Sequence, residues 1–469
     1  MTHEISTVTQ KLRGAVYPLA TLTLGALLGC AKTEGTTKTS DTSASASSTV
    51  ASSNSKCAGD NGGITLPPGF CATIFADTIG HARHIVVNSN GDVYVNTWSG
   101  KYYTSPAHPG GFLVALRDTT NDGVADVVKR FGPDSLHGSS GGTGIGIYQG
   151  SLYAEQFGAN SAKIVRYAIS ADSMTPTSPT SETIVSGLPI AGDHPMHPFV
   201  IGQAGDLYTD LGSATNSCQI KNRTLDSPGR KPCTELNSRA GIWRYSASTT
   251  NQSFSPKERY ATGIRNAVGI ALDANGQLYS TQHGRDQLYE NWPKLYTQDQ
   301  GENLPAEELL KIVKGGDYGW PYCYYDGSQQ KLVLAPEYGG DGKQVGECAS
   351  KLGPEAFVPA HWAPDGLVFY TGTSFPAHYK GGAFIAFHGS WNRAPGPQQG
   401  YNVVFVPFAG GKPVSSSKYE VFADGFAGAR KDPDGAAHRP TGVTVGPDGA
   451  LYIADDKGGR VWKVVYKGP

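Results

Sequence analysis

The sequence lacks an excess of charge of either sign. Its 39 Lys and Arg residues stand against 40 Asp and Glu residues, which leaves a formal net charge of -1. A nucleic-acid-binding protein would show a basic excess or a basic stripe. Nucleic acid is therefore not an expected partner.

Several cofactor and nucleophile motifs are also missing. No C-x-x-C-H sequence is present to attach a haem, and the absence of a dinucleotide fingerprint and of a phosphate loop disfavours a nicotinamide enzyme. Gly138 to Gly142 fits the G-x-S-x-G formula, but no strand-to-helix elbow surrounds it, so a serine hydrolase is not expected. Asp118 to Asp126 resembles a shortened calcium loop with Thr120 in place of an acidic ligand, and a plain polar turn is the preferred interpretation.

The marked apolar run near the start of the chain is too short to span a bilayer comfortably. It covers Ala15 to Leu28, follows Lys11 and Arg13, and ends in a Leu-Leu-Gly-Cys sequence that resembles a bacterial lipobox. Residues 1–30 are therefore predicted to be a lipoprotein signal peptide, with Cys30 carrying the lipid; plain secretion and an uncleaved anchor are the alternatives.

The residues that follow point to an exported protein. Residues 31–63 are rich in Ser and Thr and are predicted to be a flexible tether. Together with the lipobox, this predicts a cell-envelope lipoprotein, periplasmic or attached to the outer membrane. Removing Cys30 from the seven cysteines leaves an even number for an oxidising compartment. Proximity along the chain suggests the pairs Cys57–Cys71, Cys218–Cys233 and Cys323–Cys348, and the sequence leaves other pairings open.

Residues 64–469 repeat one pattern of strand, Gly-containing turn and strand. The chain holds 61 Gly, 30 Pro and 24 Tyr, and it has few long amphipathic helical patterns. The repeats are His84–Trp98, Gly144–Gly158, Pro198–Ser213, Val268–Gly284, Ala363–Trp391 and Pro440–Asp456. Recurrence of one hairpin favours an all-β, six-bladed β-propeller over a β-sandwich. Polar residues at the ends of the inner strands then converge on one axial mouth.

One stretch carries a resemblance to a known family. Arg265-Asn266, the loop Gln282 to Asp286 and the run Gly315 to Pro321 resemble the central blade of the soluble quinone-dependent sugar dehydrogenases, and above all the L-sorbosone and pyranose dehydrogenase branch. The likeness extends in order from Leu66 to Tyr466. It implies a propeller that binds pyrroloquinoline quinone (PQQ) and Ca²⁺, oxidises an aldose, sorbosone-like or pyranose sugar, and passes electrons to an external cytochrome c or quinone.

The resemblance also implies roles for particular residues. His194 matches the catalytic histidine, which takes a proton from the sugar hydroxyl, and Asp193 is its neighbour in sequence. Arg265 and Asn266 match a pair that contacts the quinone, where a guanidinium stabilises developing charge. The backbone carbonyls of Gly284 and Arg285 match calcium ligands, although the glucose dehydrogenases have glutamine where this chain has His283.

Further cofactor contacts are expected from three other blades. His388 or Arg393 is expected to meet a PQQ carboxylate, with Trp391 over a ring face. Arg439 aligns with one of two carboxylate-binding arginines, and Thr441 replaces the other. Arg83 is a candidate at the matching position of the first blade. For Gly315 to Pro321, a structural corner and a substrate contact both remain open.

Two alternatives belong to other functional classes. One is a non-catalytic envelope propeller that binds glycan or protein. The other is a calcium-dependent lactonase, which would need carboxylate and Asn metal ligands at channel positions where this chain offers Arg and His.

Overall fold

The computed structural model describes residues 59–97, 110–133, 141–170, 172–393 and 395–468. Within these residues the fold is nearly all β, with two short α-helices, α1 (Leu288–Asn291) and α2 (Gln298–Asn303). No helix of this part is long or apolar enough to cross a membrane. The predicted signal peptide and residues 31–58 of the predicted tether lie outside the described residues.

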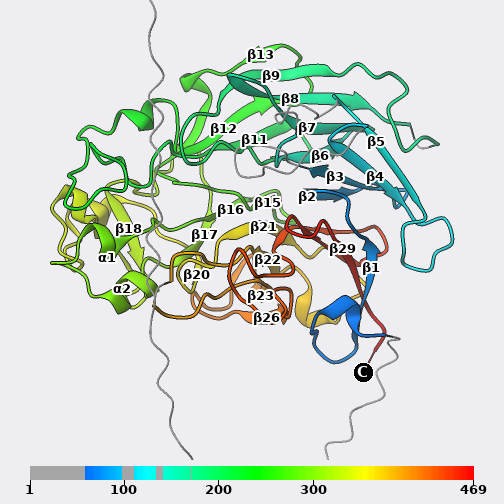
Figure 1. Cartoon of the computed structure of the whole chain (residues 1–469). Helices are drawn as coiled ribbons and strands as arrows, with labels where there is room; N and C mark the ends of the chain where they lie inside the picture. Colours follow the sequence, from blue (N-terminus) through cyan, green and yellow to red (C-terminus); the bar gives the residue numbers. More distant parts are fainter. Residues whose placement is uncertain (1–58, 98–109, 134–140, 171, 394, 469) are drawn as a thin grey trace, which may run out of the picture. The chain divides into compact units, whose positions relative to one another are not determined.

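Six sheets, antiparallel except where β13 pairs with β9, make up the blades of the fold (Figure 1). The first is β2 (Ala82–Val87), β3 (Val93–Thr97), β4 (Leu113–Arg117) and β5 (Val127–Phe131), and the second is β6 (Ile145–Tyr148), β7 (Ser151–Phe157), β8 (Ser161–Ala168) and β9 (Glu182–Pro189), extended by β13 (Gln252–Ser253). The third is β10 (Phe199–Ile201), β11 (Asp206–Leu211), β12 (Gly241–Ser246) and β14 (Arg259–Thr262).

The remaining sheets follow the same order. The fourth is β15 (Ile270–Leu272), β16 (Leu278–Gln282), β17 (Glu307–Lys311) and β20 (Ala356–Val358), and the fifth is β21 (Pro364–Phe369), β22 (Ala383–Phe387), β23 (Asn402–Val406) and β26 (Glu420–Ala423). The sixth is β27 (Pro440–Val445), β28 (Leu451–Asp455), β29 (Val461–Tyr466) and β1 (Phe70–Ala76). Two small hairpins, β18 (Cys323–Asp326) with β19 (Lys331–Leu334) and β24 (Phe408–Ala409) with β25 (Lys412–Pro413), lie outside the blades, and 3-10 turns occupy Asn61–Gly63, Thr234–Asn237, Pro256–Glu258, Pro336–Tyr338, Gly346–Ser350 and Ala377–Tyr379.

The hairpin turns have a local cause. Between β15 and β16 the Asp273 carboxylate accepts the backbone N–H groups of Asn275 and Gln277, and Gly276 has a φ of 80°. That left-handed backbone favours glycine, and the turn reverses the chain between two buried strands.

The six inner strands form a closed ring. β2, β6, β10, β15, β21 and β27 contact one another in this order, and β27 contacts β2 again. The ring is sealed within the sixth sheet, where β1 pairs with β29 in the register Phe70 to Tyr466. This arrangement confirms the predicted six-bladed β-propeller.

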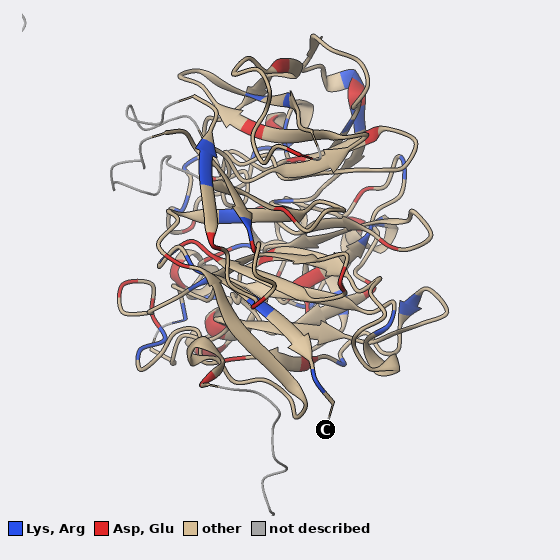
Figure 2. Cartoon of the chain, turned by 90° about the vertical axis from the view of Figure 1, so that its right-hand side faces the viewer, with Lys and Arg blue, Asp and Glu red and all other residues tan. Residues whose placement is uncertain are grey.

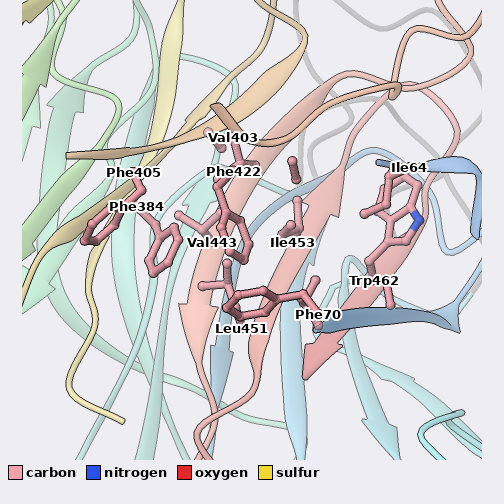
Figure 3. Close-up of a cluster of buried hydrophobic side chains, with 14 of the residues drawn as sticks. Ile64, Phe70, Phe384, Val403, Phe405, Phe422, Val443, Leu451, Ile453 and Trp462 are labelled. Atoms are coloured by element: carbon pink, nitrogen blue, oxygen red, sulfur yellow. The ribbon is translucent and has the colours of Figure 1, made fainter. Parts of the chain in front are cut away.

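Apolar side chains fill the spaces between blades. In one cluster Phe70, Phe384, Phe422 and Trp462 are buried together (Figure 3). Phe422 packs its ring against Phe70 at 5.0 Å and against Phe384 at 4.8 Å between centroids, in edge-to-face contacts. Charged residues of both signs are interspersed along the chain in the view of Figure 2.

Two of the predicted disulfides are confirmed. Cys218 bonds to Cys233 and Cys323 bonds to Cys348. The third predicted pair involves Cys57, which lies outside the described residues. Cys218–Cys233 closes a loop between β11 and β12, and this loop reaches the mouth described next.

Candidate active site

A cavity of about 520 Å³ opens at the axial mouth, where the inner strands of five blades begin. Its walls include Arg83 in β2, His194 before β10, Arg265 before β15, Asp365 in β21 and Arg439 before β27. These side chains are far apart in sequence and occupy equivalent places in their blades. The ring closure brings them together.

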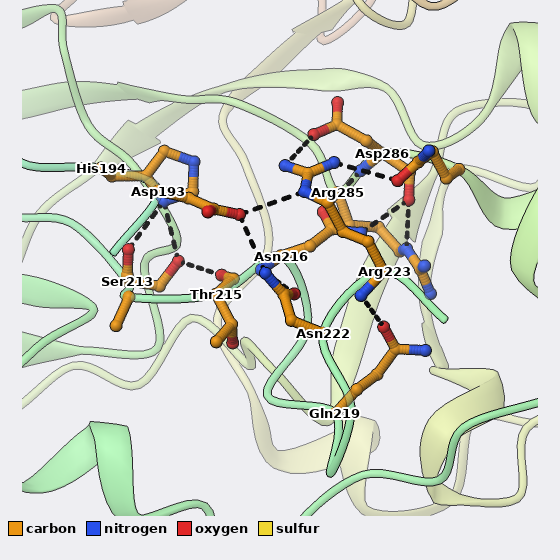
Figure 4. Close-up of polar contacts among 12 residues, drawn as sticks. Asp193, His194, Ser213, Thr215, Asn216, Gln219, Asn222, Arg223, Arg285 and Asp286 are labelled. Carbon is orange, nitrogen blue, oxygen red and sulfur yellow. Dashed lines mark hydrogen bonds and ion pairs between the residues drawn. The ribbon is translucent and has the colours of Figure 1, made fainter. Parts of the chain in front are cut away.

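The imidazole of His194 has one nitrogen anchored and one directed to the cavity. Nδ1 lies 2.8 Å from the backbone carbonyl oxygen of Ser213, and because that oxygen only accepts, Nδ1 carries the proton (Figure 4). Among the described residues no hydrogen bond occupies Nε2, which therefore presents a lone pair. Burial, followed by the positive charge of Arg265, lowers the pKa of His194 well below its usual value. Asp193 does not orient the ring; its carboxylate accepts from Arg223 instead.

A buried set of polar side chains holds the loop that carries His194. Arg239 donates to the carbonyl oxygens of His194 at 2.9 Å and Pro189 at 3.1 Å. The second nitrogen of His197 also contacts the Pro189 oxygen, while its Nδ1 lies 2.7 Å from Glu155. Since the side chains of Arg239, His197 and Glu155 are buried, they fix the loop from the interior of the protein.

Arg265 is fixed by hydrogen bonds on every side of its guanidinium. Nε donates to the Asn216 carbonyl oxygen, Nη1 to the Gly284 carbonyl oxygen at 3.0 Å, and Nη2 to Asp286 at 2.8 Å. Burial alone raises the pKa of a carboxyl group, but the guanidinium groups of Arg265 and Arg223 hold the pKa of Asp286 well below its usual range. Arg265 therefore holds a positive charge in a fixed position at the mouth, and the ionised carboxylate of Asp286 is its counter-charge.

A second charged network joins the first, fourth, fifth and sixth blades. Arg83 contacts Asp456 at 2.6 Å and Asp365 at 3.0 Å, and His388 Nε2 lies 2.8 Å from Asp456. His283 contacts Asp365 at 3.2 Å; burial opposes its protonation, but the hydrogen bond and charge of Asp365 prevail and raise the pKa of His283. Arg83, His388 and Asp365 thus face the cavity as an interlocked group.

Two further predicted residues line the cavity. Arg439 donates to the carbonyl oxygens of His388 and Gly389, each at 3.0 Å. Oδ1 of Asn266 is buried and has no hydrogen-bond partner in the described part of the chain. An unsatisfied buried acceptor beside a cavity is a place where a ligand can bind.

The structure does not bring every predicted side chain to the mouth. Arg393 is buried beside α2, where it donates to the Glu302 carbonyl oxygen and to Asn303, and it is not among the residues that line the cavity. Arg285 was predicted to act through its backbone carbonyl; its side chain pairs with Glu337 at 2.6 Å, away from the cavity.

Other predicted residues support the site from outside the cavity. Trp320, in the Gly315 to Pro321 run, donates to the carbonyl oxygen of Asn216 and packs behind the mouth as a structural corner. Thr441 donates to the Ala82 carbonyl oxygen and links the sixth blade to the first.

Several lining residues were not predicted from the sequence. They are Arg223, Asp286, Glu307, His361, Asp365 and Asn392. Asp365 is the second residue of β21, as Arg83 is the second residue of β2, so alignment of these two blades was a sufficient signal. Arg223 lies in the loop between β11 and β12 and gave no such signal.

The sequence argument against a lactonase, that the channel offers Arg and His in place of carboxylates, is wrong in part. The mouth does hold acidic side chains, but Asp286 and Asp365 are paired with arginine. Glu307 accepts N–H groups from Gly284 and Ala363, and burial raises its pKa to about 7. Among the described residues, no three carboxylate, imidazole or thiol groups converge on one point at this mouth.

The comparisons with known proteins agree on the fold. The model of the TrAA12-like family matches residues 64–467. An uncharacterized protein of Borreliella burgdorferi is 31% identical over 214 residues, 45% of this chain and 49% of that protein. A pyrroloquinoline quinone-dependent pyranose dehydrogenase of Coprinopsis cinerea is 28% identical over 233 residues, 43% of this chain and 30% of that protein. The matches thus span less than half of these relatives' own lengths.

Two solved structures resemble the whole propeller. The calcium structure of the Trichoderma reesei family AA12 enzyme has a TM-score of 0.68 at 20% identity, with 86% of this chain and 97% of the other covered. The holo form of the Coprinopsis cinerea pyranose dehydrogenase PQQ domain has a TM-score of 0.66 at 19% identity, with 87% and 98% covered. At these identities the likeness establishes the fold.

Proposed function

The chain belongs to the TrAA12-like family, and we propose that it oxidises a hydroxyl group of an aldose, sorbosone-like or pyranose sugar with PQQ as its cofactor. One observation carries the proposal: the free Nε2 of His194 and the guanidinium of Arg265 line the same cavity. A relative named as a PQQ-dependent pyranose dehydrogenase supports it.

The residues present fit PQQ, a flat ring system with three carboxylates. Arg83, Arg265 and Arg439 offer guanidinium groups, the natural partners of carboxylates. Trp391 is 53% exposed and lines the cavity, so its indole face is available to a flat ring. The unsatisfied Asn266 oxygen can accept from a ring N–H.

The chain's own residues supply acid–base and electrostatic chemistry. When bound, PQQ supplies a quinone carbon that accepts hydride. His194 takes the hydroxyl proton at Nε2, and the Ser213 carbonyl keeps Nδ1 protonated and the ring in place. Arg265, held by Asn216 and Asp286, supplies a fixed positive charge that would stabilise a quinone oxygen as it becomes negative.

We propose that calcium accompanies the cofactor, on grounds of charge. The cavity is lined by four arginines, Arg83, Arg223, Arg265 and Arg439, and by four carboxylates, Asp193, Asp286, Glu307 and Asp365. These charges nearly cancel, so a tricarboxylate would stay uncompensated without a divalent cation. The carbonyl oxygens of Gly284 and Arg285 suit calcium. Gly284 would share its oxygen between the ion and Arg265.

The location and the acceptor are further parts of the proposal. We propose an exported lipoprotein attached through Cys30, whose electrons pass to an external cytochrome c or quinone. A Cys30→Ser variant is expected to move from the membrane fraction to the soluble fraction while keeping its activity. Retention of the variant in membranes would contradict the lipid anchor.

Reconstitution tests the activity directly. Purified protein is incubated with PQQ, with and without Ca²⁺, and dye reduction is followed with a panel of aldoses, ketoaldoses and pyranoses. We expect sugar-dependent reduction whose rate falls by about 10²- to 10⁴-fold in His194→Gln, without loss of PQQ binding as measured by the cofactor's absorbance. PQQ binding without oxidation of any sugar would overturn the activity, and absence of PQQ binding would favour the non-catalytic glycan- or protein-binding alternative.

A further inference from the structure

The loop between β11 and β12 carries a cation to the outer edge of the mouth. It is closed by the Cys218–Cys233 disulfide, and the Glu235 carboxylate accepts the backbone N–H groups of Ala214 and Thr215 at its base. Within it Arg223 has a φ of 55°, a left-handed backbone that a non-glycine residue rarely adopts. Such a conformation persists only where surrounding contacts enforce it, and it is common at functional sites.

Arg223 is held by contacts to two other blades (Figure 4). Its Nε donates to Asp193 at 3.1 Å, its Nη2 to Asp286 at 2.9 Å and its Nη1 to Gln287 at 3.1 Å. Its guanidinium carbon also lies 6.0 Å from the centre of the Trp391 ring. These contacts therefore fix the orientation of the Arg223 side chain.

Two N–H groups of this guanidinium remain available. An arginine has five N–H donors, and the three contacts above use one on each nitrogen. The remaining hydrogens on Nη1 and Nη2 have no partner in the described part of the chain. The side chain lines the cavity and is 28% exposed, against 4% for Arg265, so Arg223 is the more outward of the two cations that share Asp286.

The charge of Arg223 is already balanced. Asp193 and Asp286 flank it, while Asp286 also serves the buried Arg265. A balanced guanidinium with unused donors suits an uncharged oxygen better than another carboxylate. We propose that Arg223 is a specificity-determining residue that donates to a hydroxyl or ring oxygen of the neutral sugar at the entrance of the mouth. This inference rests on the function proposed above.

A substrate-deletion cycle tests this role. Wild type, Arg223→Met and Arg223→Lys are compared, loaded with PQQ and Ca²⁺, on D-glucose, D-mannose and D-galactose and on their monodeoxy analogues. For the analogue that lacks the oxygen contacted by Arg223, we expect the kcat/KM of wild type to fall by about 10- to 100-fold, which corresponds to the loss of one hydrogen bond to a charged group. The same deletion is expected to change Arg223→Met less than about 3-fold, and Arg223→Lys to be intermediate.

The control is Arg244→Met, an arginine of β12 that pairs with Asp206 outside the mouth. It is expected to keep the wild-type loss for every analogue. If Arg223→Met also keeps that loss, with its KM unchanged, the inference is wrong while the proposed oxidation stands.

Sugar binding gives a second readout that needs no turnover. Calorimetric titration of the same sugars, with and without PQQ, is expected to show weaker binding by Arg223→Met than by wild type. Binding that depends on Arg223 without oxidation would keep the inference and reject the proposed function. Equal binding by both proteins, or no binding by wild type, would reject the inference. A variant that fails to fold is replaced by Arg223→Lys, which keeps the charge and loses the forked geometry.

Discussion

Replacing Asp286 by Asn should destabilise the protein far more than a chemically identical change at the surface. Asp286 accepts from Arg265 at 2.8 Å and Arg223 at 2.9 Å through Oδ2, and from Asn392 at 2.9 Å through Oδ1. Asparagine has nearly the same shape but no charge, so two guanidinium groups lose their shared counter-charge. Breaking a buried ion pair from one side costs about 3–5 kcal/mol.

The surface pair Arg244 and Asp206 provides the matched control. These side chains are 46% and 33% exposed and meet at 2.6 Å. Water already solvates both groups, so Asp206→Asn should cost less than about 1 kcal/mol. Urea unfolding of the two variants and the wild type, followed by tryptophan fluorescence, gives the free energies of unfolding. Similar losses for both variants would refute the reasoning.

The pH dependence gives an independent check on Asp286. Its folded pKa is depressed by the two arginines, so its stabilisation is fully present above the unfolded value of about 3.9 and is lost as the pH falls below it. The difference in unfolding free energy between wild type and Asp286→Asn should therefore narrow between pH 5 and pH 3. A difference that stays constant over this range would show that packing, not charge, accounts for the loss.

Three other outcomes are expected. His194→Gln should lower kcat by about 10²- to 10⁴-fold in dye reduction, as for loss of a general base, with PQQ affinity unchanged. Because burial and Arg265 lower the pKa of His194, its neutral base form persists in mild acid. We therefore expect that kcat/KM does not fall between pH 7 and pH 6 through protonation of His194. A fall in kcat/KM centred at pH 6.5 that is absent in His194→Gln would contradict this. Phe384→Ala should cost about 3–5 kcal/mol in urea unfolding, because its ring is fully buried between the fifth and sixth blades, whereas truncation of the exposed Val414 should cost little.

The sequence was sufficient for the propeller because the signal was local and repeated. Each Gly-containing turn and its two alternating strands report the same hairpin, and all six predicted hairpins are present as inner strand pairs. Cys218–Cys233 and Cys323–Cys348 followed from short separations along the chain, where few residues intervene.

The site was only partly predictable, for physical reasons. Residues next to inner strands, such as Arg83 and Arg439, have places fixed by the blade, and they line the cavity. Arg393 lies on a long loop, where strand alternation no longer sets the direction of a side chain, and it packs against α2. Arg223 depends on a tertiary path enforced by contacts with Asp193 and Asp286, which no local pattern encodes.

The pairing of β1 with β29 has a consequence for how the protein is made. The outermost strand of the sixth sheet, starting at Phe70, has no hydrogen-bonding partner in that sheet until residues 461–466 have left the ribosome. Arg83 of the first blade and Asp456 of the sixth blade meet at 2.6 Å, which joins the two ends of the ring. A nascent chain can therefore complete individual hairpins early, but the ring closes and the mouth is assembled only after residues 461–466 have been synthesised.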